Sequence, residues 1–225
     1  MSSNRSAIAW QGEPLPSGRH KLAQAEVRAS QRARILRGIL EVVAKQGYEA
    51  ATVAQVVAAA RVSRNAFYEL FDDRTDCFIA ACDEQATELL NTVLAFAAEP
   101  DWIAALRAGM RAYLDWWAQR PAFARAYFIG LPAAGQAAVA QRERAYAQFR
   151  QMFVELGRRA RAEQPSLPPL GELVPRVLVL TITELVAEEV RAGRTERLPG
   201  LEPELVRLAG KLLADDSSVR RALVG

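Results

Sequence analysis

The sequence predicts an all-α protein of nine helices, in which an N-terminal three-helix helix-turn-helix module precedes a six-helix C-terminal bundle. Apolar residues recur at helical spacing along most of the 225 residues, and no segment shows the clean alternation of a half-buried strand. A capping box runs from Thr52 to Gln55, and prolines and glycines separate the periodic segments. The composition, 51% apolar and 24% charged, is that of a folded globular chain. Its length suffices for a core without disulfides or metals.

The N-terminal third contains two short helices joined by a tight turn. Residues 1–23 carry two prolines and two glycines without periodicity, so we interpret them as a flexible arm. A first helix is predicted from about Ala25 to Gln46. Thr52 then caps a second helix, and Ser63 caps a third. A short helix, a turn and a second short helix form the helix-turn-helix layout.

The rest of the chain predicts a helical body. Asp72 or Asp73 and Asp101 are candidate N-caps, and Pro100 and Pro121 are candidate breaks. The six expected helices span about 73–98, 101–120, 121–130, 132–163, 170–193 and 202–215.

Several functional classes are disfavoured by residue usage. The only histidine, His20, lies outside the patterned segments, and Cys77 and Cys82 do not share a helix face. No phosphate-loop, dinucleotide, zinc-protease or nucleophile-elbow motif is present. We therefore expect no enzyme, no catalytic or metal-binding residues and no cofactor. The N-terminus lacks an apolar secretion segment and the best candidate for a membrane span, Val177–Ile182, is too short to cross a bilayer, so we expect a cytoplasmic protein without membrane contact.

Positive charge is concentrated near the N-terminus. Residues 1–71 contain ten Lys/Arg and five Glu, a net charge of +5, whereas the remaining residues carry −2. This asymmetry suggests a module that faces a polyanion. A solvated surface with chance asymmetry is the alternative on charge alone. Within the arm, Arg5, Arg19 and Lys21 could enter a minor groove, or the arm could be an untethered tail.

The segment TVAQVVAAARVSRNAFYELF, Thr52 to Phe71, followed by DDRTDCFIAA, resembles the DNA-binding signature of the tetracycline-repressor (TetR) family of bacterial regulators. The resemblance covers about residues 28–82. It implies that the third helix enters a major groove of double-stranded DNA, where Arg can pair with guanine and Asn with adenine. The DNA-contacting residues expected on this basis are Thr52, Arg61, Ser63, Arg64, Asn65, Ala66, Tyr68 and Arg74.

Four positions depart from the family pattern. Relatives usually carry glycine where Arg61 stands, and arginine tolerates positive φ poorly, so the turn is expected to be strained or differently shaped unless Arg61 adds a DNA contact. Relatives carry glycine or serine at Asn65, histidine near Leu70 and lysine at Arg74.

Bulky aromatic residues gather between residues 100 and 155. Such residues are ordinarily core, but the resemblance implies a cavity between the helices that holds a small-molecule effector, apolar or aromatic in character. The expected pocket residues are Tyr113, Trp117, Tyr127, Phe128, Phe149, Thr181 and Glu184. A carboxylate at Glu184 would favour a cationic ligand, while a solvent-facing Glu184 is the alternative.

The resemblance further implies that the last two helices pair with those of a second copy. The expected interface residues are Val177, Leu180, Leu205, Leu208 and Leu212. The chain is then divided into the arm (1–23), a DNA-binding domain (24–73) and an effector-binding and dimerisation domain (74–225). The function predicted is a homodimeric repressor released from a palindromic operator by an effector. The alternatives are a small-molecule-binding protein or enzyme with a vestigial helix-turn-helix, and a protein–protein adaptor.

Overall fold

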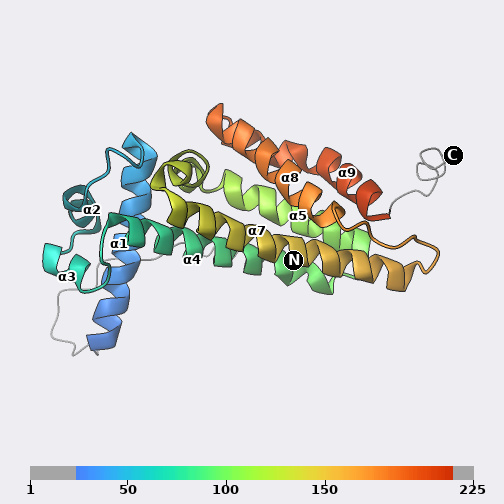
Figure 1. Cartoon of the computed structure of the whole chain (residues 1–225), viewed down its shortest axis with the longest axis horizontal. Helices are drawn as coiled ribbons and strands as arrows, with labels where there is room; N and C mark the ends of the chain where they lie inside the picture. The colour runs from blue at the N-terminus through green and yellow to red at the C-terminus, as the bar shows by residue number, and fades with distance from the viewer. Residues whose placement is uncertain (1–23, 215–225) are drawn as a thin grey trace, which may run out of the picture.

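A computed structural model describes residues 24–214, and the arm with its basic residues Arg5, Arg19 and Lys21 lies outside that range. Nine α-helices form the described part of the chain, as the sequence predicts. They are α1 (Gln24–Gln46), α2 (Val53–Ala60), α3 (Arg64–Tyr68), α4 (Arg74–Leu94), α5 (Trp102–Ala118), α6 (Pro121–Arg125), α7 (Gln136–Glu163), α8 (Val174–Arg191) and α9 (Glu202–Ala214). Helices α1 to α3 lie at one end, and α4, α5 and α7 run along the long axis beside α8 and α9 (Figure 1).

Side-chain caps begin the helices at the predicted residues. Thr52 accepts a hydrogen bond from the backbone N–H of Gln55, and the Gln55 side chain accepts one from the Thr52 N–H at 2.8 Å, which completes the capping box. Ser63, Asp73 and Asp101 each accept a bond from the backbone N–H three residues later, at 3.1, 2.8 and 2.7 Å. These bonds satisfy donors that a helix leaves free at its start. The starts of these four helices could therefore be predicted from local sequence.

The region between Pro121 and Glu163 differs from the prediction. One turn of α-helix, α6, continues as a π-helical segment over Ala126–Gly130 and a 3-10 segment over Leu131–Ala134. Gly135 then adopts a φ of 79°, a conformation that favours glycine, and α7 begins after it instead of at Pro132. The other helix whose start moves is α8, which begins at Val174 instead of about residue 170.

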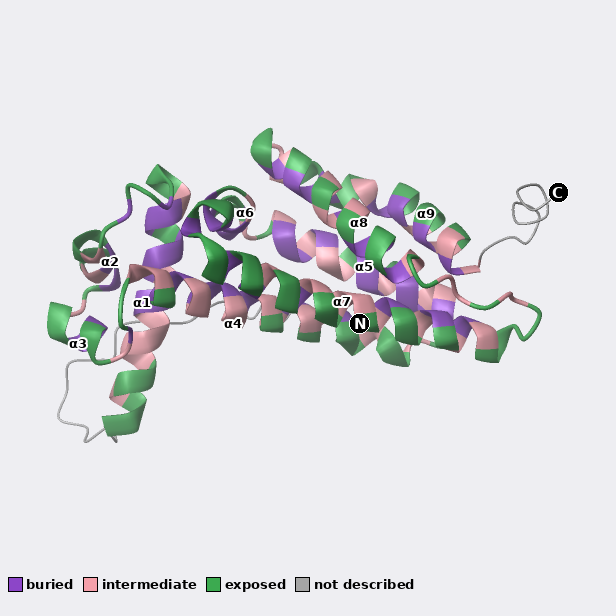
Figure 2. Cartoon of the chain, viewed as in Figure 1, coloured by how far each residue is buried: buried purple, intermediate pink, exposed green. Residues whose placement is uncertain are grey.

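The helix-turn-helix module packs closely on the first helix. A Cβ atom at Gly38 of α1 would lie 3.1 Å from the Val56 carbonyl oxygen and 3.2 Å from the Ala60 nitrogen of α2. Glycine at this position therefore lets the two backbones approach. Figure 2 shows purple, buried stripes on the facing sides of the helices. Within residues 24–214, no helix combines the length and hydropathy required to cross a bilayer.

Candidate functional site

The short helix α3 presents a polar end to solvent. Ala66 and Phe67 are buried, whereas Arg64, Asn65 and Tyr68 are exposed. The Phe67 ring lies 5.7 Å from that of Phe71, which anchors the helix in the core. The exposed residues occupy the first turn and the outer face, the part of such a helix that usually reaches base edges. For Ala66 the structure differs from the prediction, because its methyl group packs inward and cannot also face DNA.

The turn before α3 contains the strained residue that the sequence predicts. Arg61 has φ 53° and ψ 50°, the one positive φ of a non-glycine residue among those described. The Arg34 guanidinium of α1 donates from Nη1 to the carbonyl oxygens of Ala60, at 3.2 Å, and Arg61, at 3.0 Å. The turn therefore keeps the tight left-handed form that glycine would supply, and the Arg61 side chain remains exposed.

Arg74, a predicted DNA contact, makes hydrogen bonds within the module. Its guanidinium lies over the Tyr48 ring, 4.3 Å from the centroid, and donates to the carbonyl oxygens of Glu49, at 3.2 Å, and Ala51. These contacts tie the start of α4 to the loop between α1 and α2. Thr52 and Ser63, two further predicted DNA contacts, lie exposed at the starts of α2 and α3.

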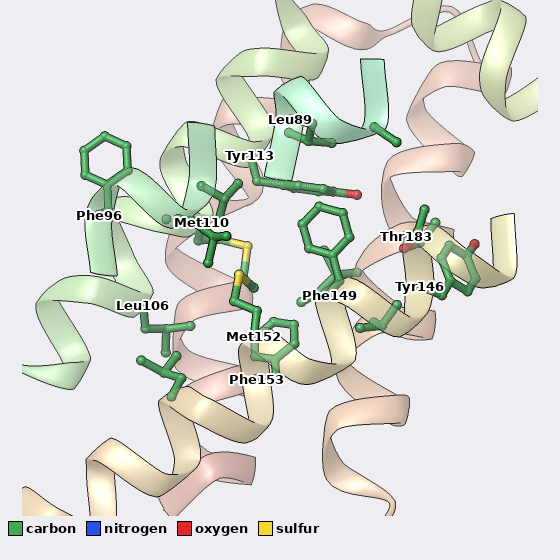
Figure 3. A pocket seen from close by; sticks show the side chains of 18 of the residues that line it. Leu89, Phe96, Leu106, Met110, Tyr113, Tyr146, Phe149, Met152, Phe153 and Thr183 are labelled. Carbon is green, nitrogen blue, oxygen red and sulfur yellow. The ribbon is translucent and has the colours of Figure 1, made fainter. Parts of the chain in front are cut away.

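A cavity of about 210 Å³ lies between α4, α5, α7 and α8. Most of its wall is aliphatic and aromatic, with the thioethers of Met110 and Met152 facing its middle (Figure 3). Five predicted pocket residues line it: Tyr113, Trp117, Tyr127, Phe128 and Phe149. Sequence analysis missed the aliphatic and methionine lining, since an apolar helix position looks the same whether it faces a cavity or a neighbouring side chain.

Two predicted pocket residues lie elsewhere. Helix α8 lines the cavity through Val179, Ile182 and Thr183, so Thr181 and Glu184 lie on other sides of that helix. Glu184 is exposed and pairs with Arg191. The basis for expecting a cationic ligand is thereby removed. Thr183 is the residue of α8 whose hydroxyl group reaches the cavity. Which side of α8 faces the cavity depends on how that helix packs against the others, and the sequence does not give that packing.

Hydroxyl groups gather at one end of the cavity. Tyr113 and Tyr146 both lie within hydrogen-bonding reach of Thr183, and Tyr127 is close to both tyrosines. Burial raises the pKa of the Tyr113 and Tyr127 phenols well above their ordinary value. They therefore remain neutral donors near neutral pH. Figure 3 shows the Tyr113 oxygen directed toward the side on which Thr183 and Tyr146 lie.

An apolar face is left exposed on α8 and α9. Leu173, Val177, Leu180 and Leu208 are 68%, 43%, 46% and 38% exposed. Of the other predicted interface residues, Leu212 is half-buried. Leu205 differs from the prediction, because it is 3% exposed and belongs to the inward row of α9 with Ala209 and Leu213.

The geometry of α1, α2 and α3 is that of a helix-turn-helix module. Residues 35–81 match the family model described as "Bacterial regulatory proteins, tetR family". The match runs from the second half of α1 to the start of α4, and the rest of the chain lies outside it.

Solved structures share the fold at low sequence identity. The fatty acid degradation regulator FadR from Bacillus halodurans has a TM-score of 0.74 at 17% identity, over 82% of this chain and 95% of that one. The regulator FadR from Bacillus subtilis, in complex with stearoyl-CoA, gives 0.70 at 14%, over 81% and 97%. A tetR-family regulator from Rhodococcus RHA1 gives 0.66 at 21%, over 82% and 97%. No curated protein matches in sequence.

Proposed function

We propose that the protein is a homodimeric repressor that binds a palindromic operator and is released by a small-molecule effector. The observation that carries this proposal is the exposed start of α3, with Arg64 and Asn65 displayed on a module that matches the TetR family model. Arg64 is suited to a bidentate contact with guanine and Asn65 to one with adenine. Thr52, Ser63, Tyr68 and the exposed Arg61 would contact the phosphate backbone around them.

A dimer would serve both the stability and the function of this chain. The exposed leucines and valine of α8 and α9 form the kind of apolar patch that marks an interface. A two-fold axis through that patch would present two α3 helices to half-sites about 34–36 Å apart. We therefore retain the boundary between the two domains at Asp73 and Arg74, where α4 leaves the module.

The cavity supports the effector part of the proposal. Its wall is mainly apolar, and the similar FadR structure contains stearoyl-CoA, so an apolar ligand is the first class to examine. Helix α4 begins beside the DNA-binding module and lines the cavity further along through Leu89 and Val93. A ligand that favours one position of α4 would change operator affinity only through its differential affinity for the two conformations.

Ion pairs link α4 to three neighbouring parts of the chain. Asp83 pairs with Arg144 of α7, Glu84 with Arg32 of α1, and Glu88 with Arg120, which precedes α6, at 2.7 Å. A displacement of α4 would have to exchange these contacts. The pair with Arg32 of α1 is therefore the point at which a displacement of α4 would reach the module.

The experiment is binding of the full chain to the DNA that flanks its own gene, titrated at several salt concentrations with random DNA as competitor. A regulator should bind one palindromic segment selectively and lose affinity steeply as salt rises. Absence of binding at low salt would favour the alternative function, a small-molecule-binding protein or enzyme whose helix-turn-helix is vestigial. That alternative rests on Arg61 and Leu70, and the regular turn at Arg61 reduces its support.

A further inference from the structure

A buried amide without hydrogen bonds lies one helical turn beyond the cavity. Ala145, Phe149 and Phe153 of α7 line the cavity at intervals of four residues, and Gln141 precedes them on the same row. Gln141 is fully buried, and within residues 24–214 neither its Nε2 nor its Oε1 has a hydrogen-bond partner. Buried polar groups are almost always paired, so an orphaned amide next to a cavity calls for a partner.

A positive charge lies beside this amide. Arg142 is half-buried, its Nε is buried without a hydrogen-bond partner, and its Cζ is 5.9 Å from the centre of the Tyr146 ring. None of the ion pairs found among the described residues includes Arg142. Burial raises the pKa of Tyr127 and Tyr146, and the charge of Arg142 opposes that rise in both. The guanidinium therefore lies near the Tyr146 ring.

The arginine at the opposite end of the cavity is fully engaged. Arg159 donates from Nε to Glu163 at 2.7 Å and from its two terminal nitrogens to the carbonyl oxygens of Ala97, at 2.8 Å, and Glu99, at 2.6 Å. Donors without a hydrogen-bond partner lie toward the Arg142 end. These are the Arg142 Nε–H and the Gln141 amide, with the hydroxyl groups of Tyr127 and Tyr146 nearby.

We propose that the cavity binds an elongated apolar molecule with one carboxylate, and that the carboxylate lies toward Arg142 and Gln141. This inference rests on the proposed effector function and specifies its ligand. A set made chiefly of donors with one cation favours an anionic acceptor, and a carboxylate in an apolar site needs such a partner. The lining of α7 from Ala145 to Arg159 extends over about 21 Å at 1.5 Å per residue, which suits a long apolar tail.

The test uses the full chain and two matched pairs of probes, decanoate with 1-decanol and 2-naphthoate with 2-naphthol. Affinities are measured by isothermal titration calorimetry below the aggregation concentration of each probe. The wild type should prefer at least one carboxylate over its matched alcohol by tenfold or more. Arg142→Gln should weaken carboxylate binding about 10- to 100-fold, the range expected for a charge-assisted hydrogen bond, and leave alcohol binding within about twofold.

Two further variants separate ligand binding from folding. Arg158→Gln removes a charge from the same helix, where Arg158 is exposed and paired with Glu155, and should leave every affinity unchanged. Gln141→Leu removes the orphaned amide, so it should raise the unliganded Tm by about 2–4 °C while weakening carboxylate binding. If Gln141 served only the fold, the substitution would lower both the unliganded Tm and the affinity for carboxylates.

The outcomes distinguish this inference from the proposed function. Equal affinity for carboxylate and alcohol in the wild type, an unchanged preference in Arg142→Gln, or no binding of any probe would overturn the carboxylate site, whatever the result with DNA. Selective carboxylate binding that Arg142→Gln abolishes would support the site. If the same preparation then failed to bind DNA, only the regulator proposal would fail.

Discussion

The Arg34 guanidinium of α1 binds the carbonyl oxygen of Arg61, the residue that turns the chain between α2 and α3 with a positive φ. The same nitrogen binds the Ala60 carbonyl oxygen, so one side chain satisfies two acceptors that the end of α2 leaves free. Arg61 follows α2, whereas Arg34, whose hydrogen bonds hold the turn, belongs to α1. The position of α3 relative to α1 therefore depends on a contact that local sequence does not reveal.

Arg61→Gly should stabilise the protein and weaken its binding to DNA. Relief of the left-handed backbone should raise the free energy of unfolding by about 1 kcal/mol. Loss of the exposed guanidinium should reduce the salt dependence of DNA affinity by about one phosphate contact. Urea unfolding and a salt titration measure the two effects. A fall in stability would contradict the assignment of strain.

Arg34→Met should lower the free energy of unfolding by about 1–3 kcal/mol, since it keeps the apolar stem and leaves two carbonyl groups without their donor. Arg37→Met, on the same helix, where the side chain is 40% exposed and pairs with Glu41, is the control and should change stability by less than about 0.5 kcal/mol. Equal effects of the two substitutions in urea unfolding would show that the hydrogen bonds from Arg34 to Ala60 and Arg61 contribute no more to stability than a surface contact does.

The sequence predicts a structural feature well where the residues that cause it lie close together in the chain. The caps at Thr52, Ser63 and Asp101 lie within three residues of the donors they satisfy, so their helices could be predicted. The start of α7 could not, because the π-helical and 3-10 turns before Gly135 adapt to packing against α1 and α7.

The candidate sites follow the same rule. Aromatic residues such as Tyr113 and Trp117 mark the cavity by their bulk. The choice of Thr183 over Thr181, or of Leu208 over Leu205, depends on how a helix is rotated toward its neighbours. Hydrophobic periodicity fixes that rotation only approximately.

Asn65→Ala and Arg64→Ala should each reduce specific operator affinity by about 1–3 kcal/mol and relax selectivity at one base position. Only the arginine variant should also reduce the salt dependence, because asparagine carries no charge. Binding to a set of single-base operator variants separates the two roles. Unchanged selectivity in both variants would show that α3 does not contact bases through these residues.

Arg74→Gln tests whether this residue braces the module or contacts phosphate. Its stacking on Tyr48 and its bonds to two carbonyl oxygens predict a loss of about 1–3 kcal/mol in the free energy of unfolding. A phosphate contact alone would leave stability unchanged and reduce the salt dependence of DNA binding. Urea unfolding and the salt titration, performed on the same variant, distinguish the two roles.

The two cysteines should make stability fall at alkaline pH. Burial raises the pKa of both the Cys77 and the Cys82 thiol above the ordinary value. Above about pH 8.5 the unfolded chain loses these protons and the folded chain keeps them, so unfolding is favoured by up to about 1.4 kcal/mol per pH unit and thiol. Urea unfolding from pH 8 to 10 measures this, and a Cys77→Ala, Cys82→Ala variant should show a smaller slope. Rapid labelling of the native thiols by a disulfide reagent at pH 8 would contradict the burial.

Leu180→Glu should convert the proposed dimer to a monomer without unfolding it. Leu180 is 46% exposed on α8, so a charge there is tolerated by an isolated chain but would be desolvated in an apolar interface. Light scattering after size exclusion measures the mass, and operator affinity should fall with it because only paired α3 helices span both half-sites. Leu205→Ala is the matched contrast: this leucine is buried within the chain, so the substitution should cost about 2–5 kcal/mol of stability and leave the mass unchanged. A Leu180→Glu protein that remains dimeric would place the interface on another face.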